Sequence, residues 1–265
     1  MPADERLALI QVKIERAKEH IINLNSAIRT FFDSTPYQVS TKRDPQTRKL
    51  IYYVSGIQPT PTCFATITGD VIQNLRSALD HLAQQLFLVG TNGVTPGRHV
   101  YFPIERNAAE YKSQLLRKVK GMRQDAIDAL NAIEPYKGGK GHMLWVLQEL
   151  NNIDKHRLLV TVGSSFQSVN IGAHMRPMMQ MNAAGIPFPK MDLYVRPADN
   201  LFPLKVGDEL FIDAVDAEVN KEMDFRFNIA LSEPGVLEGA ALLDTLQYFS
   251  DLVNNTVLLF KPCLT

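Results

Sequence analysis

Apolar residues recur every three or four positions over much of the chain, and this spacing predicts long amphipathic helices. In the first of them, from Leu7 to about Asp33, the apolar positions keep a heptad spacing. We expect this helix to pack in a bundle of its own chain, with a seam between two copies of the chain as the alternative. Further helices are predicted over residues 64–89, 107–120, 123–133 and 142–157.

Other segments change to the period of two that is typical of strands. Residues 37–57 contain two β-rich runs around a polar loop and are expected to form a hairpin. Pro234 is expected to open a C-terminal helix, and the Met- and Pro-rich residues 175–191 are expected to form a long loop. Strands are predicted after Arg157 over residues 158–162, 168–171, 192–195, 209–215 and 223–231.

Together these elements predict an α+β fold. It is a helical bundle with an inserted hairpin, followed by a small antiparallel β-sheet and a C-terminal helix. Residues 1–157 are expected to be mainly helical, with the hairpin at about 37–57, and residues 158–265 to form the sheet and the last helix. We expect the two parts to pack as one unit, since 265 residues suffice to bury a substantial core.

The composition excludes several classes of protein. The formal net charge is zero, so no global field attracts nucleic acid or anionic membrane. Cys63 and Cys263 are too far apart in the sequence for a metal or redox motif, which fits a reducing compartment. No apolar run reaches membrane-spanning length and no signal peptide is recognised, so we expect a cytoplasmic protein without a membrane partner.

Two of the predicted helices carry dense polar clusters. One flank of the helix over residues 64–89 carries Asp70, Asn74, Ser77 and His81. Its other flank carries Gln73, Arg76 and Asp80. The helix from His142 carries Glu149 and ends in the polar run Asn151, Asn152, Ile153, Asp154, Lys155, His156 and Arg157. We expect the two clusters to lie together, because helical spacing places each of them on one side of its helix.

These same stretches carry a resemblance to known proteins. Residues 74–81, 134–136, 144–145 and 150–157 resemble a widespread family of uncharacterised bacterial proteins. Arg76 and His81 also have the Arg-x4-His spacing of the HEPN superfamily, whose members are all-helical domains. Many of them are metal-independent RNases of defence and toxin–antitoxin systems. The resemblance implies that Arg76 stabilises a scissile phosphate and that His81 acts as general acid or base.

On the nuclease hypothesis RNA is the partner and no cofactor is needed. Residues five apart diverge by about 140° on one helix, so Arg76 and His81 could converge only across a homodimer or in a broken helix. The candidate catalytic residues are Arg76, His81, Asp154, His156 and Arg157. The candidate supporting polar residues are Asn74, Asp80, Asn151 and Asn152. The basic residues 112–120 would hold the RNA backbone.

Two other hypotheses use the same side chains. In the first, a buried hydrogen-bond network fixes the packing of the two helices, and the chain is a non-enzymatic structural or interaction protein. The network would be built from Asp70, Asn74, His81, Glu149, Asn152 and His156. In the second, a divalent metal is bound by Asp70, His81, Glu149 and His156, as in a helix-bundle hydrolase. A small-molecule pocket under the Met-rich loop is a further alternative.

Overall fold

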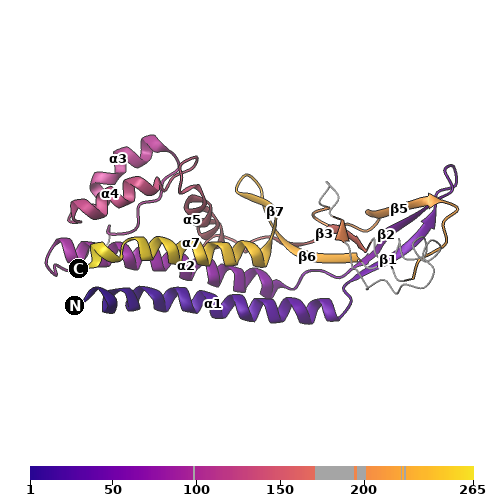
Figure 1. Cartoon of the computed structure of the whole chain (residues 1–265), viewed down its shortest axis with the longest axis horizontal. Helices are drawn as coiled ribbons and strands as arrows, with labels where there is room; N and C mark the ends of the chain where they lie inside the picture. Colours follow the sequence, from indigo (N-terminus) through magenta and orange to yellow (C-terminus); the bar gives the residue numbers. More distant parts are fainter. Residues whose placement is uncertain (98, 171–193, 196–200, 222, 224) are drawn as a thin grey trace, which may run out of the picture.

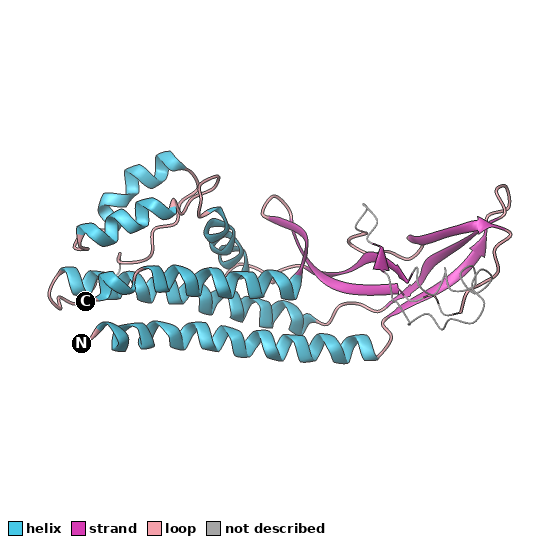
Figure 2. Cartoon of the chain, in the orientation of Figure 1, coloured by secondary structure: helices cyan, strands magenta, loops and turns pink. Residues whose placement is uncertain are grey.

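The protein has a helical half and a β half, and Figure 2 shows that they lie end to end along the long axis. The computed structural model describes residues 1–265 except 98, 171–193, 196–200, 222 and 224. The helices are α1 (Ala3–Asp33), α2 (Thr62–Gly90), α3 (Ala108–Lys118), α4 (Gln124–Ile133), α5 (His142–Asp154), α7 (Leu242–Leu259) and the 3₁₀ helix η1 (Lys261–Leu264). The α+β expectation is confirmed.

The helical half is built on α1, α2 and α7, which lie side by side along the long axis (Figure 1). The heptad stripe of α1 is buried against α2 and α7, so it packs within its own chain as expected. Its buried members are Leu7, Ile10, Ile14, Ala17, Ile21, Leu24, Ile28 and Phe31. Both termini lie at the end of the bundle remote from the strands, where Lys261 Nζ pairs with Asp4 Oδ1 at 2.8 Å.

The remaining helices lie on one side of this bundle. Helix α5 packs against α2 and α7, while α3 and α4 lie above α7 in the view of Figure 1. The side chain of Asn107 caps α3 by accepting a hydrogen bond from the backbone N–H of Glu110 at 2.9 Å. Lys118 at the end of α3 forms a buried ion pair with Glu105. These contacts fix the segments that precede α5.

The β half contains two antiparallel sheets, ordered β1-β2-β5 and β4-β3-β6-β7. The strands are β1 (Tyr37–Arg43), β2 (Lys49–Ile57), β3 (Thr161–Asn170), β4 (Tyr194–Val195), β5 (Glu209–Val215), β6 (Phe225–Glu233) and β7 (Leu237–Ala241). The hairpin β1–β2 thus pairs with a strand from far along the chain. Tyr37 of β1 joins the two sheets, because its hydroxyl group lies against Gly163 of β3, where a Cβ would come within 2.7 Å of its ring.

Two elements differ from the prediction. The C-terminal helix begins at Leu242 and not at Pro234, since Pro234 and Gly235 form the turn of the β6–β7 hairpin. Gly235 has a φ of +73°, a left-handed conformation that glycine adopts without strain, and its N–H donates to Glu238 Oε1. One strand, β3, also replaces the two predicted over residues 158–171. The Met-rich residues 175–191 lie outside the described part of the chain.

Candidate functional site

The candidate site lies where α2 packs against α5, and Arg76 of α2 is at its centre. This residue is only 7% exposed. Its Nη1 donates to Asp80 Oδ1 at 2.5 Å, its Nη2 donates to the carbonyl oxygen of Phe102 at 3.2 Å, and its Nε donates to Gln148 Oε1. Asp80 follows one helical turn after Arg76, so the helix itself aligns this ion pair. All three guanidinium nitrogens therefore donate hydrogen bonds within the protein.

The same ion pair holds the segment before α3 on the bundle. The backbone N–H of Phe102 donates to Asp80 Oδ1 at 3.0 Å, while its carbonyl oxygen accepts from Arg76. Phe102 itself is fully buried, and its ring meets that of Phe260 edge-on at 6.2 Å. The ion pair therefore provides hydrogen-bond partners for the backbone N–H and carbonyl of Phe102, which would otherwise be buried without them. This role is structural.

The hydrogen bonds continue from Arg76 along α5. Gln148 Nε2 donates to Asn152 Oδ1 at 3.0 Å, and Asn152 Nδ2 donates to Glu149 Oε1 at 3.3 Å. We call this set the α2–α5 network, and its members are Arg76, Asp80, Gln148, Glu149, Asn152 and the backbone of Phe102. Sequence reasoning included four of these side chains among its candidates and missed Gln148, although its spacing of four from Asn152 was a usable signal.

Two predicted residues of α2, Asn74 and His81, lie on its other flank, away from this network. Asn74 donates from Nδ2 to the backbone carbonyl of Asp70 at 2.8 Å, and its side chain lines a cleft beside α1. The side chain of His81 is half-buried and makes no hydrogen bond with any residue in the described ranges. The flank that meets α5 is thus the one with Arg76, and not the one with His81.

The alternative metal-binding set is not gathered at one point. Within the described residues, no three His, Cys, Asp or Glu side chains are placed so that they could hold a metal ion. Glu149 belongs to the α2–α5 network, whereas His156 is exposed beyond the end of α5. Asp70 is exposed on α2.

The polar run that ends α5 is divided between the interior and the surface. Asn151 is buried at 2% exposure, while Lys155 and His156 are exposed. The carboxylate of Asp154 lies against Gly69 of α2, where an added Cβ would come within 2.6 Å of Asp154 Oδ2. Burial, and then the negative charge of Asp70, raise the pKa of the Asp154 carboxyl above its ordinary value. Its position at a helix C-terminus is also unfavourable for an anion.

We therefore expect the Asp154→Asn substitution to raise the melting temperature at neutral pH. Because folding raises this pKa, the carboxyl costs no stability below its ordinary pKa of about 3.8. The cost grows as the pH rises from that value to the folded pKa. The gain should thus vanish near pH 3 and reach a plateau above the folded pKa. Thermal melts from pH 3 to 8 test this. Asp33→Asn is the control, because Asp33 is exposed at the C-terminus of α1. An equal rise in the melting temperature of Asp33→Asn would contradict the view that burial and the charge of Asp70 make the Asp154 carboxylate unfavourable.

Arg157 connects the end of the helical half to the second sheet. Its Nη1 and Nη2 donate to the two carboxylate oxygens of Glu233 at 3.1 and 2.6 Å. Glu233 is fully buried and also accepts a hydrogen bond from the backbone N–H of Val160 at 2.7 Å. The hydrogen bonds and then the charge of Glu233 raise the pKa of the Arg157 guanidinium. Sequence reasoning did not identify Glu233, because no local pattern marks it as the partner of Arg157.

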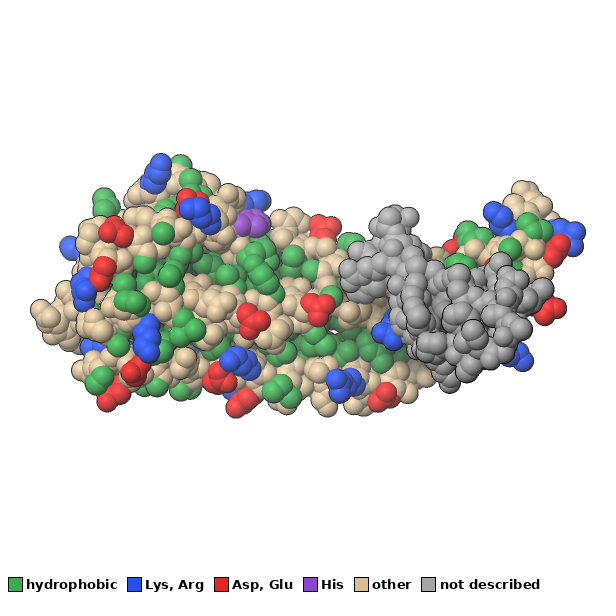
Figure 3. Space-filling model, viewed as in Figure 1, with side chains coloured by type: hydrophobic (Ala, Val, Ile, Leu, Met, Phe, Trp, Pro, Cys, Tyr) green, Lys and Arg blue, Asp and Glu red, His purple; other side chains and the backbone are tan. Residues whose placement is uncertain are grey.

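The basic residues 112–120, which were expected to bind the RNA backbone, differ in their environments. Lys118 is buried in its ion pair with Glu105, and its Nζ lies 4.6 Å from the ring centre of Tyr101. Lys112 and Arg117 are exposed on α3. On the face drawn in Figure 3, Lys and Arg side chains alternate with Asp and Glu along the bundle. This face therefore presents no continuous basic surface.

The glycine-rich residues 137–141 form a turn before α5. The N–H of Gly139 donates to the carbonyl of Tyr136, and the N–H of Gly141 donates to the carbonyl of Glu134. The N–H of Lys140 donates to Glu134 Oε2 at 3.3 Å. These N–H groups are thus used within the turn, whereas a phosphate-binding loop directs them at its ligand.

The predicted site residues fall into two groups. Some belong to the buried α2–α5 network, and the others, including both histidines, lie outside it. His81 lies on α2, and His156 follows the end of α5. Neither imidazole belongs to the α2–α5 network. Within the described residues no helix is long and apolar enough to cross a membrane. Comparison of the chain with models of protein families, with curated proteins and with solved structures gave no match.

Proposed function

We propose that this chain is a non-enzymatic interaction protein in which the α2–α5 network is structural. The observation that carries the proposal is the environment of Arg76. Its three guanidinium nitrogens donate to Asp80, Gln148 and the carbonyl of Phe102, and the residue is almost fully buried. A satisfied buried network of this kind specifies one packing of the helices that share it.

The nuclease alternative requires two of these residues to contact the same ligand. It needs the guanidinium of Arg76 and the imidazole of His81 on one phosphate group. Both residues belong to the continuous helix α2, and Arg76 is turned towards α5 while His81 lies on the other flank. A second copy of the chain could approach His81 but would still find Arg76 covered. The contacts of Arg76 thus favour the structural role over the catalytic one.

An RNA degradation assay tests this proposal. A fluorescently labelled RNA is incubated with the purified chain in EDTA and analysed on a denaturing gel, beside the His81→Ala and Gln84→Ala variants. Gln84 is an exposed residue of α2 and serves as the control. We expect the three proteins to leave the RNA equally intact. Cleavage by the parent and the control that falls by about 100-fold or more in His81→Ala would overturn the proposal, because a general acid or base contributes that much.

A further inference from the structure

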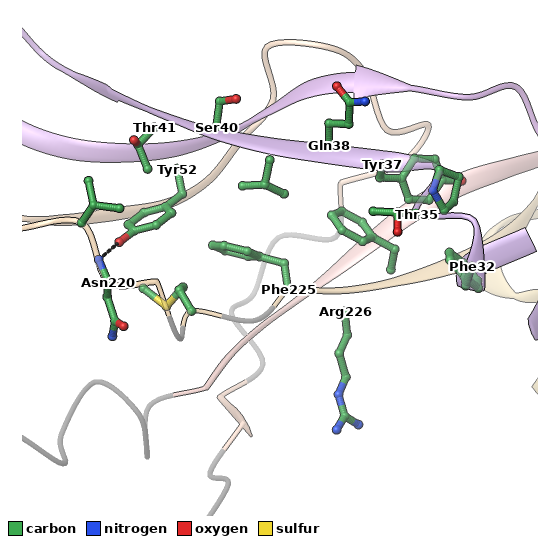
Figure 4. Close-up of a pocket in the computed structure, with 15 residues that line it drawn as sticks. Phe32, Thr35, Tyr37, Gln38, Ser40, Thr41, Tyr52, Asn220, Phe225 and Arg226 are labelled. Atoms are coloured by element: carbon green, nitrogen blue, oxygen red, sulfur yellow. Dashed lines mark hydrogen bonds between the residues drawn. The ribbon is translucent and has the colours of Figure 1, made fainter.

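The β half contains a groove of about 950 Å³ between β1 and the beginning of β6 (Figure 4). Aromatic rings line it and pack against one another, with 4.9 Å between the ring centres of Tyr37 and Phe227 and 5.7 Å between those of Tyr52 and Phe225. The hydroxyl of Tyr52 also accepts a hydrogen bond from the backbone N–H of Asn220 at 2.9 Å. The described lining is thus engaged in contacts within the chain and does not select one class of ligand.

The outer face of α3 differs, because it carries cations without partners. Residues 111–123 contain five Lys and Arg residues and no Asp or Glu, in a chain whose formal net charge is zero. Two of these cations are used within the protein, in the ion pairs Lys118–Glu105 and Arg123–Asp125. The remaining three are exposed and form no hydrogen bond or ion pair with the described residues: Lys112, Arg117 and Lys120.

An exposed leucine lies among these three cations. Leu116 is 78% exposed, more than any other large apolar side chain in the described part of the chain. Residues four apart on a helix are neighbours on one face, so Lys112 lies one turn before Leu116, and Lys120 lies in the turn that follows the helix. The helix α3 packs on the protein through Tyr111 and Leu115, and in the view of Figure 1 it is the helix farthest from α1. Leu116 therefore faces solvent.

The stability of α3 alone does not account for this face. Cations in the last turn of a helix interact favourably with its dipole, which is a sufficient reason for Arg117. That reason does not apply to Lys112, which lies in the middle of the helix. It does not apply to Leu116 either, whose apolar surface is left in water. An apolar side chain with free cations around it is suited to contact a partner of opposite charge.

We propose that the outer face of α3 binds an acidic amphipathic helix of another protein. Leu116 packs against an apolar residue of that helix, and Asp or Glu residues one turn before and after this residue meet Lys112 and Lys120. Charged pairs that flank an apolar contact are typical of packed helices. Nucleic acid would bind the cations through its phosphate groups and leave Leu116 unused, so the leucine favours a protein partner. This inference rests on the proposed interaction role and names the partner by its chemistry.

Selection from a library of helical peptides tests the inference with the full chain. Peptides of about eighteen residues, long enough to form a helix, are randomised on one face and displayed on phage. The affinities of labelled synthetic copies are measured by fluorescence anisotropy. We expect the enriched peptides to place Asp or Glu four residues before and after an apolar residue. Copies with Asn or Gln at these acidic positions should bind about tenfold more weakly or worse.

Two pairs of matched variants locate the binding surface. Leu116→Gln removes the apolar side chain and keeps a good helix former, and Leu259→Gln makes the same change at an exposed leucine of α7. Lys112→Glu reverses a charge on α3, and Arg29→Glu reverses an exposed charge on α1. We expect each α3 variant to weaken binding by about tenfold or more and each control to change it by less than about twofold. All four residues are exposed, so the variants should fold, which circular dichroism checks.

Any of three results with the peptides would overturn the inference: no enrichment, equal binding of the acidic peptides and their amide copies, or equal binding to the parent and to Leu116→Gln. A single-stranded RNA is measured against the same variants. If it binds more tightly than the peptides and depends on Lys112 but not on Leu116, the face binds nucleic acid and the inference is wrong. The RNA degradation assay reports on α2. Failure of the peptide experiment would therefore leave the structural role of the α2–α5 network standing, and RNA cleavage would leave the peptide result standing.

Discussion

The Arg76→Met substitution is expected to lower the free energy of unfolding by about 3 kcal/mol. Methionine keeps much of the apolar volume of the side chain but donates no hydrogen bond. The substitution leaves the carboxylate of Asp80 without its cation, and it leaves the carbonyl of Phe102 and the amide of Gln148 without a donor. The side chain of Asp80 is 33% exposed, so water partly solvates the remaining carboxylate, whereas the carbonyl of the fully buried Phe102 loses its donor inside the protein.

Chemical unfolding in urea, followed by circular dichroism, measures this change. The melting temperature should fall by about 6–12 °C for a chain of this size. Arg16→Met is the matched control, since Arg16 forms an exposed ion pair with Glu19 one turn away on α1, and such pairs contribute less than about 1 kcal/mol. If the two variants lose the same small amount, the α2–α5 network is not a structural element, and the proposed function loses its main support.

Local periodicity was sufficient to predict the helices. The heptad positions of α1, such as Ile10, Ile14 and Leu24, are fully buried, because a stripe that recurs every three or four residues can only face one direction on a helix. Helix α5 could be placed for the same reason, with an error of three residues at its end. These features depend on neighbours within one or two turns, which the sequence displays directly.

Pairing between distant segments was not predictable in the same way. The hairpin β1–β2 joins β5, which lies about 150 residues later in the chain. Alternation identifies a strand but does not say which strand lies beside it. Pro234 shows a second reason why the sequence prediction failed, here for the start of the C-terminal helix. A proline opens many helices, but here the glycine that follows it makes a turn, and the turn allows Glu233 to pair with Leu237.

The candidate site was partly predictable for the same physical reasons. The spacing of four between Arg76 and Asp80 is visible in the sequence and gives their ion pair. Nothing in that spacing says which flank of α2 meets α5, and both flanks are polar. The partners Gln148, Phe102 and Glu233 are reached only through tertiary packing. A polar stripe thus indicates where a network can form, and the packing decides which of its members join.

A second loss of stability is expected at Arg157. Its side chain is half-exposed, but Glu233, to which it donates two hydrogen bonds, is fully buried. The Arg157→Ala substitution leaves that carboxylate with the N–H of Val160 as its donor. We expect the free energy of unfolding to fall by more than it does in Glu233→Gln, because a buried carboxylate loses its cation. Glu233→Gln should cost only about 1 kcal/mol, because Arg157 can then turn to water.

A double-mutant cycle separates these contributions. The combined variant, Arg157→Ala with Glu233→Gln, retains a neutral acceptor for Val160 and no buried charge, so it should recover more than half of the loss caused by Arg157→Ala. Urea unfolding of the four proteins measures the coupling. Additive losses would mean that the two side chains act independently, and the connection between α5 and β6 would then depend on backbone pairing alone. Recovery would instead identify Arg157 as the partner that permits a carboxylate inside the second sheet, which is a structural role for a residue that the nuclease hypothesis places in catalysis.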